Sequence, residues 1–443
     1  MKGISPYFSL RANWLLIIVF CILTSCSGTR RAFQPVEKTF SSSPVFEKGF
    51  VGMMVYDPEK KEVLYQHNSG KYFTPASNMK LFTFYTGLKV LGDSVPGLRY
   101  TVSNDTLYFT GTGDPSFLNP DLPASPVVDF LKNRNEKLVF VAPGYTESRL
   151  GPGWAWDDYN AYYSAERSAF PVYANQVIFD FAEGARAPKV YPQIFADSLS
   201  SLDDASEFER VKRQPYVNLF QYANPRANED YTQNVPFTNS PELVANLLQD
   251  TLGKTIHLKE EAPKMAFSEE IFSIPSDSLY KQMLEVSDNF LAEQILLLAA
   301  GKLSDTLKTS VAIDYMKENH LQDLPDEPVW RDGSGLSRYN LVTPRSMVRL
   351  LEKIKEEVPY EDLFVMLPVG GKSGTLKNRL HADEAFVFAK TGSLSNNHSL
   401  SGYLKTKKGK IFIFSFMNSN YTVPSSILRA EMDRILTLIR DNN

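Results

Sequence analysis

The chain has 443 residues, of which 43% are hydrophobic and 22% are charged, and its formal net charge at pH 7 is −4. This length is too great for one compact core, so we expect two or three domains. The small acidic excess argues against a nucleic-acid-binding protein, which carries a basic excess, and the 29 Phe and 22 Tyr exclude collagen-like, coiled-coil and disordered chains.

Residues 1–26 have the pattern of a lipoprotein export signal. Basic residues precede an apolar run over 14–23, which is shorter than the ~20 residues of a membrane-spanning helix. The run ends in Leu23-Thr24-Ser25-Cys26, and small residues before a cysteine at this place resemble a bacterial lipobox. This resemblance implies that Cys26 becomes the first mature residue and carries lipid. A plain signal peptide with an incidental cysteine is the alternative.

The segment after the signal predicts where the protein resides. No cysteine follows Cys26, so the mature chain can form neither an internal disulfide nor a zinc site built on several cysteines. Residues 27–45 are polar and rich in Ser and Thr, and we expect a tether there. The absence of an acidic run directly after Cys26 favours a periplasmic protein that is anchored to the outer membrane through its lipid.

Ordered structure is predicted to begin near Phe46. Residues 50–56 and 62–67 are rich in β-forming side chains and flank a turn, which predicts a hairpin. Apolar residues at helical spacing then predict a helix that begins near Ser77 and ends near Gly92.

The rest of the chain predicts one sheet built from both ends. Short β-like segments between Gly and Pro turns fill residues 99–270. The later predicted elements are helices over 281–298 and 343–354, strands over 386–389, 400–404 and 411–417, and a C-terminal helix with the apolar stripe Ile427, Leu428, Met432, Ile435 and Leu436. We therefore expect residues 46–98 and 271–443 to form one domain, with β-rich domains inserted at 99–270.

Three short motifs occur in an order that is typical of serine acyl-transfer enzymes. They are Ser77-Asn78-Met79-Lys80 (S-x-x-K), Ser287-Asp288-Asn289 (S-D-N) and Lys390-Thr391-Gly392 (K-T-G). Lys80 lies one helical turn after Ser77, where burial can lower its pKa so that it serves as a base. Taken singly, each motif has an ordinary structural interpretation, such as Ser77 as a helix N-cap. Their joint occurrence favours catalysis.

Similar patterns elsewhere lack the right context. Ser278-Leu279-Tyr280-Lys281 is also S-x-x-K, but it comes only nine residues before Ser287. Lys372 begins a variant of K-T-G within a glycine-rich loop, whereas Lys390 follows an apolar strand.

The chain resembles the penicillin-binding protein and serine β-lactamase superfamily. The long stretch between the first two motifs resembles the class C low-molecular-mass penicillin-binding proteins, the D-Ala-D-Ala carboxypeptidase/endopeptidase family. The resemblance spans about residues 46–440. Further short sequence motifs that look like those of the family occur in the family's order, at 111–115, 153–158, 332–337, 367–369 and 374–377. The resemblance implies an α+β fold: a transpeptidase/β-lactamase-like domain, with an antiparallel sheet flanked by helices, interrupted by two smaller β-rich domains.

The same resemblance implies chemistry on peptidoglycan stem peptides, with β-lactam antibiotics as inhibitors and no cofactor or metal. The implied catalytic roles are Ser77 as nucleophile, Lys80 as general base and Ser287 as proton relay. Asn289 would hold a substrate amide, and Lys390 and Thr391 would bind the terminal carboxylate. Gly392 and Ser393 are further substrate-binding residues, and the N–H groups of Ser77 and Ser393 would form the oxyanion hole. An acid of the insertion, Asp157 or Asp158, would meet the free amine of a diaminopimelate side chain, and we favour Asp158. The alternative is a surface turn with two solvated acids. Glu166 and Arg167 depart from a less polar stretch of the family.

Two other functions stay open at this point. A β-lactamase would need a fast route for water, and the Glu-x-x-Leu-Asn word of class A enzymes is absent between Asn289 and Lys390. A lipid-anchored wall-binding protein without catalysis is the other, and the intact motifs argue against it. The five His form no H-x-x-x-H pair, which argues against a metallopeptidase. No Gly-x-Ser-x-Gly elbow occurs, which argues against a different class of serine hydrolase.

Overall fold

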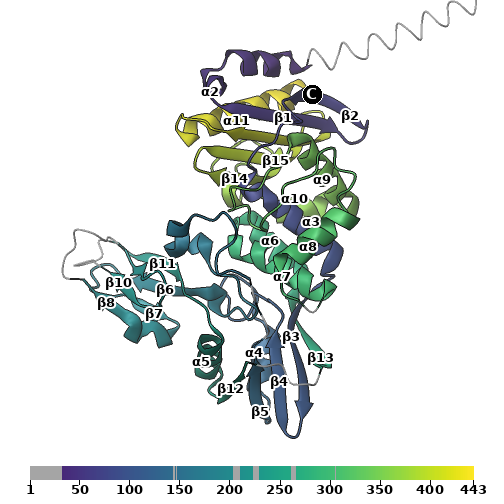
Figure 1. Cartoon of the computed structure of the whole chain (residues 1–443). Helices are drawn as coiled ribbons and strands as arrows, with labels where there is room; N and C mark the ends of the chain where they lie inside the picture. Colours follow the sequence, from purple (N-terminus) through teal and green to yellow (C-terminus); the bar gives the residue numbers. More distant parts are fainter. Residues whose placement is uncertain are drawn as a thin grey trace, which may run out of the picture.

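The computed structural model describes residues 32–142, 145, 147–202, 210–222, 229–260, 266–304 and 306–443. The predicted signal over 1–26, including Cys26, lies outside these residues. The molecule is elongated: a sheet built from both ends of the chain lies at one end, and the inserted segment extends to the other (Figure 1).

One five-stranded antiparallel sheet joins the two ends of the chain, as predicted. Its strands lie in the order β14 (Val387–Leu394), β15 (Asn397–Lys405), β16 (Ile411–Ser419), β1 (Phe50–Asp57) and β2 (Glu62–His67). The edge strand β14 continues beyond the strand predicted at 386–389 and contains the whole K-T-G motif. This extension decides where the side chains of that motif point.

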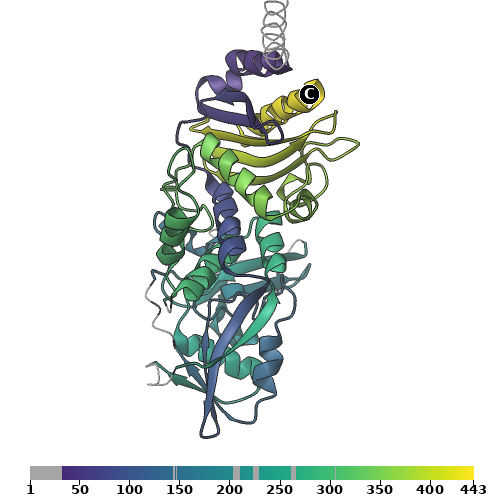
Figure 2. The ribbon, with the colours of Figure 1, turned by 90° about the vertical axis from the view of Figure 1, so that its right-hand side faces the viewer.

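The two faces of the sheet pack against different helices (Figure 2). Met54 of β1 lies in the core of one face, and its neighbours Met53 and Val55 lie in the core of the other, as the alternation of a strand requires. The helices of the first core are α3 (Lys80–Val90), α6 (Ser276–Glu285), α7 (Asn289–Leu303), α8 (Thr309–Asn319), α9 (Pro344–Glu357) and α10 (Tyr360–Met366). The C-terminal helix α11 (Ser425–Asn442) covers the second face with its predicted stripe, except that Ile427 is 48% exposed.

The predicted tether over 27–45 is wrong for the part that the structure describes. Residues 32–42 are helical, and α2 (Pro44–Glu47) follows them. Phe33, Val36 and Phe40 are buried in the same core as α11. Their spacing of three and four residues puts them on one helix face, a pattern that the polar composition of the segment conceals.

The chain between β1–β2 and the later helices builds three further sheets. The largest has the strand order β12 (Ile256–Lys259), β5 (Lys137–Val141), β4 (Thr106–Gly111), β3 (Ser94–Ser103) and β13 (Glu269–Pro275). The second has the order β11 (Tyr231–Pro236), β6 (Gln176–Phe181) and β7 (Lys189–Tyr191). The third has the order β8 (Leu199–Ser201), β10 (Phe220–Tyr222) and β9 (Lys212–Arg213). Helices α4 (Pro126–Lys132) and α5 (Pro241–Leu252) pack into their shared core. Because β3 and β13 pair antiparallel, the insertion leaves and rejoins the helical part at one place. The predicted α+β fold with β-rich insertions is confirmed.

Candidate active site

The first motif places its serine on a short turn directly before a helix. Ser77 belongs to the 3-10 turn η1 (Ala76–Met79), which leads into α3. Pro75 occupies the N-cap position of this turn, so the interpretation of Ser77 as a helix cap is wrong. Ala76 has a φ of 48°, a left-handed conformation that costs energy in a residue with a side chain and that clusters at functional sites.

The side chain of Lys80 reaches this serine from inside the protein. Lys80 is fully buried. Its Nζ donates hydrogen bonds to Ser77 Oγ at 3.0 Å, to Asn289 Oδ1 at 2.6 Å and to the carbonyl of Ser334 at 2.7 Å. Lys80 and Asn289 are 209 residues apart in the sequence, so the fold brings the first and second motifs together as predicted.

These contacts orient the lone pair of a neutral lysine. An amide oxygen and a backbone carbonyl only accept hydrogen bonds, so Asn289 Oδ1 and Ser334 O each take one N–H of Lys80. The charged amine can donate to all three partners. When it loses a proton, its two remaining N–H bonds stay on Asn289 Oδ1 and Ser334 O, and the lone pair then faces Ser77 Oγ. In this state Lys80 can accept the hydroxyl proton of Ser77, as a general base must.

The surroundings of Lys80 set its pKa close to neutral. Burial lowers the pKa of Lys80 to about 8 because the charged amine loses its hydration. The carboxylates of Asp288, Asp332 and Glu293 act in the opposite direction and limit the shift. A base with such a pKa is partly unprotonated at neutral pH and still accepts a proton readily.

Two glycines pack directly against the turn that carries Ser77. A Cβ on Gly392 would lie 3.0 Å from Ser77 N. A Cβ on Gly335, whose φ is +80°, would lie at the same distance from Ser77 N and would meet the carbonyl of Ala76. The close approach of Gly392 places β14 beside the Ser77 N–H group, where the predicted oxyanion hole needs the N–H of Ser393 as its second donor.

The second motif begins on the loop before α7. Ser287 lines the cleft described below and has a φ of 67°, a left-handed conformation that is uncommon for serine. Asp288 caps α7, since its side chain accepts the N–H of Leu291 at 2.9 Å. The middle residue of this motif therefore has a structural role as the N-cap of α7.

Asn289 is used on both sides of its amide group. Its oxygen accepts from Lys80, and its Nδ2 donates to the carbonyl of Tyr163 at 2.9 Å. Asn289 therefore orients the lysine and ties the insertion to α7. Its predicted contact with a substrate amide remains a prediction.

The third motif alternates along β14. Lys390 is fully buried, and its Nζ donates to the carbonyl of Thr391 at 3.0 Å. Because β14 continues through the motif, the side chain of Lys390 is directed inward. Its predicted contact with a substrate carboxylate remains a prediction. Burial and the nearby charge of Lys80 lower the pKa of Lys390 well below its ordinary value. Thr391 and Ser393, two residues apart on the strand, line the cleft instead.

Ser77 opens into a cleft of about 740 Å³, a volume suited to a small ligand or the end of a peptide. Its walls come from residues 155–163 of the insertion, the second motif, the loop 335–338 and β14. The predicted site residues in these walls are Ser77, Ser287, Asn289, Thr391, Ser393 and Asp158. Arg338, Arg379 and Arg429 also line the cleft, beside the acids Asp157 and Asp158.

The acid pair of the insertion lies in the wall of this cleft. Asp157 is exposed, and Asp158 is half-buried and accepts a hydrogen bond from the hydroxyl of Tyr163 at 2.8 Å. Of the neighbouring tryptophans, Trp154 is buried in the protein and Trp156 is 77% exposed. The pair is therefore placed where a substrate can reach it.

One buried acid, Asp332, holds a loop of the site in place. The sequence analysis named it only as part of the motif at 332–337 that resembles the family. Asp332 is fully buried. It accepts hydrogen bonds from Trp154 Nε1 at 2.8 Å, Gly335 N at 2.9 Å, Ser337 N at 2.6 Å and Asn340 Nδ2 at 2.7 Å. These bonds fix the loop whose carbonyl at Ser334 holds Lys80. An aspartate followed by Gly and Ser is a signal for such a loop.

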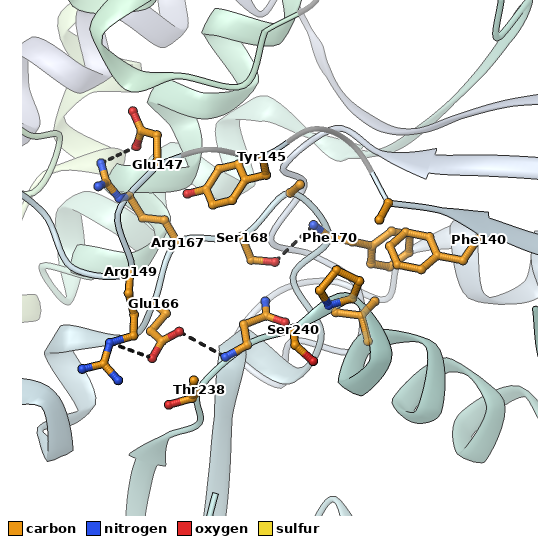
Figure 3. A pocket seen from close by; sticks show the side chains of 15 residues that line it. Phe140, Tyr145, Glu147, Arg149, Glu166, Arg167, Ser168, Phe170, Thr238 and Ser240 are labelled. Atoms are coloured by element: carbon orange, nitrogen blue, oxygen red, sulfur yellow. Dashed lines mark hydrogen bonds and ion pairs between the residues drawn. The ribbon is translucent and has the colours of Figure 1, made fainter. Parts of the chain in front are cut away.

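Figure 3 shows a second cavity, which has a volume of about 300 Å³. Phe140 and Phe170 line one part of it, and Glu166 and Arg167 line another. Arg167 forms a buried ion pair with Glu147 at 2.6 Å. Among the described residues the two cavities share no lining residue, so the departures from the family at Glu166 and Arg167 lie outside the wall of the cleft.

Comparisons with known proteins agree with this geometry. The model of the D-Ala-D-Ala carboxypeptidase 3 (S13) family matches residues 33–439. A D-alanyl-D-alanine carboxypeptidase of Actinomadura sp. is 27% identical over 87% of this chain and 80% of its own length. The D-alanyl-D-alanine carboxypeptidase DacB of Haemophilus influenzae is 23% identical over 95% of both chains. The crystal structure of penicillin binding protein 4 from the same organism shares the fold, with a TM-score of 0.73 at 20% identity over 92% of this chain and 99% of that chain.

Proposed function

The chain belongs to the D-Ala-D-Ala carboxypeptidase 3 (S13) family, and we propose that it is a serine D-Ala-D-Ala carboxypeptidase/endopeptidase that acts on peptidoglycan stem peptides and binds penicillins. The observation that carries this proposal is the buried amine of Lys80, 3.0 Å from Ser77 Oγ at the base of an open cleft. Burying a lysine costs free energy, which a wall-binding protein without catalysis has no reason to spend at this place.

In the proposed reaction, Ser77 Oγ attacks the carbonyl carbon before the terminal D-Ala while its proton passes to Lys80. The N–H groups of Ser77 and Ser393 stabilise the negative oxygen of the tetrahedral intermediate. The proton then passes through Ser287 to the leaving amine, the C–N bond breaks, and D-Ala departs. Water attacks the remaining ester, releases the shortened peptide and returns the proton to the serine.

The test is release of D-alanine from a peptide that ends in D-Ala-D-Ala, with a cross-linked stem-peptide dimer as the endopeptidase substrate. The purified protein should release D-alanine and should form a stable adduct with a labelled penicillin. Ser77→Ala should lose both activities. Ser278→Ala, in the second S-x-x-K pattern on α6, is the matched control and should keep both. Rapid hydrolysis of the penicillin would favour the β-lactamase alternative.

The rate of penicillin acylation should rise with pH up to about 8 and then level off. Only the unprotonated amine of Lys80 can accept the serine proton, and burial places its pKa at about 8. Below that pH, each unit lowers the unprotonated fraction about tenfold. The second-order rate constant of acylation between pH 5.5 and 9.5 measures this dependence. A rate constant that does not change between pH 6 and 8 would contradict the assigned base.

Asp158→Asn should lower kcat/KM for a peptide with a free diaminopimelate amine and spare its N-acetylated counterpart. Losing a charge-assisted hydrogen bond corresponds to roughly 10- to 150-fold. Asp157→Asn, measured beside it, decides which acid meets the amine. Penicillin acylation is the control, because a small β-lactam does not need this wall. An unchanged ratio between the two peptides in both variants would remove the acid pair from the substrate site.

We further propose that the protein is exported to the periplasm and anchored to the outer membrane by lipid on Cys26. The lipobox-like residues Leu23 to Cys26 support this proposal. Among the described residues, no helix has both the length and the apolar character needed to cross a membrane. Cys26→Ser should abolish labelling with a fatty-acid probe and move the protein from the membrane to the soluble fraction. Unchanged fractionation would argue against the anchor.

A further inference from the structure

A chain of hydrogen bonds within the wall of the cleft ends on the hydroxyl of Ser393. His398 Nδ1 lies 2.8 Å from Ser393 Oγ, and His398 Nε2 lies 3.2 Å from Arg379 Nη1. Arg379 is held in turn by Asp433 of α11, to which its Nη2 donates at 2.7 Å. His398 is buried, whereas Ser393 is exposed to the cleft.

The arginine decides which nitrogen of the histidine carries the proton. A guanidinium only donates hydrogen bonds, so His398 Nε2 must accept the bond from Arg379. A neutral imidazole whose Nε2 is unprotonated carries its proton on Nδ1. An imidazolium would set two donors against each other. Burial, with the charges of Arg379 and Arg429, also lowers the pKa of His398 to about 3, so the ring is neutral at pH 7.

The proton on Nδ1 in turn fixes the role of the serine. His398 Nδ1–H donates to Ser393 Oγ, and the hydroxyl proton of Ser393 is then free to point into the cleft. Thr391 lies on the same side of β14, but its hydroxyl donates to Thr375 Oγ1 at 2.7 Å. Of these two hydroxyls in the wall, that of Ser393 is the one with its proton available to a ligand.

We propose that His398 is a positioning residue that makes the Ser393 hydroxyl a hydrogen-bond donor towards the cleft and thereby selects substrates that end in a carboxylate. A carboxylate only accepts hydrogen bonds. A serine hydroxyl that directs its proton into the cleft can therefore bind a carboxylate, whereas one that directs a lone pair into the cleft repels it. Lys390 is buried, and its Nζ donates to the carbonyl of Thr391. The inference rests on the proposed function and deepens it, because it names the group that sets the polarity of the carboxylate site.

The protonation of the histidine can be measured without any substrate. The full-length protein labelled with 15N-histidine, compared with its His398→Phe variant to assign the signals, reports the state of both ring nitrogens at pH 7. We expect a protonated Nδ1 and an unprotonated Nε2 for His398. A proton on Nε2, with or without one on Nδ1, would overturn the inference. This result does not depend on turnover, so it is distinct from a failure of the proposed function.

The selection of a carboxylate is tested with two peptides that differ only in ending in D-Ala or in D-alaninamide. Ser393→Ala should lower the ratio of their kcat/KM values roughly 10- to 150-fold, the effect of one charge-assisted hydrogen bond. His398→Phe should also lower this ratio. In a protein that already carries Ser393→Ala, adding His398→Phe should leave the ratio unchanged. A merely structural role of His398 would reduce both kcat/KM values equally. An unchanged ratio in His398→Phe, or its full effect in the Ser393→Ala background, would overturn the proposal.

Discussion

Lys80→Met should slow penicillin acylation by roughly 10²- to 10⁴-fold, the contribution of a positioned general base. Methionine keeps the length of the side chain and removes the amine, so Ser77 loses the acceptor 3.0 Å from its hydroxyl. The bonds to Asn289 and Ser334 are lost with it. The residual acylation should also lose the rise with pH that the lysine confers. Stopped-flow kinetics with a fluorescent penicillin measures both properties.

The matched control is Lys372→Met, in the variant of K-T-G. Lys372 is exposed, and its loss should leave acylation unchanged. If Lys80→Met keeps a rate within roughly tenfold of the unaltered protein, the serine proton goes to another group and the assignment of the base is wrong.

Asp332→Asn should destabilise the protein by about 2–6 kcal/mol, although the two side chains have nearly the same shape. Each carboxylate oxygen accepts at least two hydrogen bonds: one from Gly335 N and Asn340 Nδ2, the other from Trp154 Nε1 and Ser337 N. Whichever way an asparagine turns, its NH2 group faces two N–H donors and leaves them unsatisfied. Each buried donor without a partner costs about 1–3 kcal/mol.

Urea unfolding measures this loss, and Asp157→Asn is the control. Asp157 is an exposed acid of the cleft, so its neutralisation should change the free energy of unfolding by no more than about 0.5 kcal/mol. Acylation should also fall in Asp332→Asn, because the loop that holds Lys80 through the Ser334 carbonyl is loosened. Equal stability of the two variants would show that the bonds of Asp332 do not hold this loop.

The central sheet, helix α11 and the Ser77–Lys80 pair could be predicted because the sequence patterns that indicate them are local. The strands at both ends of the chain have β-forming patterns, and the Leu428 to Leu436 stripe of α11 has helical spacing. Ser77 and Lys80 are one turn apart, so their contact follows from the helix itself. The motif order then indicated that distant segments meet, and the bond between Lys80 and Asn289 confirms that they do.

The errors come from contacts between distant segments. The sequence placed Lys390 after a strand, whereas pairing with β15 extends β14 through the motif and buries the lysine. The helix over 32–42 forms because Phe33, Val36 and Phe40 find an apolar sheet face to cover, and local composition does not reveal that face. His398 could not be assigned a role, because its partner Arg379 becomes its neighbour only in the fold.

The central claim is that the acyl group of the substrate is carried by Ser77. The direct measurement is mass spectrometry of proteolytic digests of the protein. One sample is digested after reaction with penicillin, and the other after a reaction with a D-Ala-D-Ala peptide that is stopped rapidly by a quenching agent. Both digests should show the added acyl mass on the peptide that contains Ser77, and neither should show it in the Ser77→Ala variant. An adduct on Ser278 or Ser287, or D-alanine release that persists in Ser77→Ala, would contradict the account.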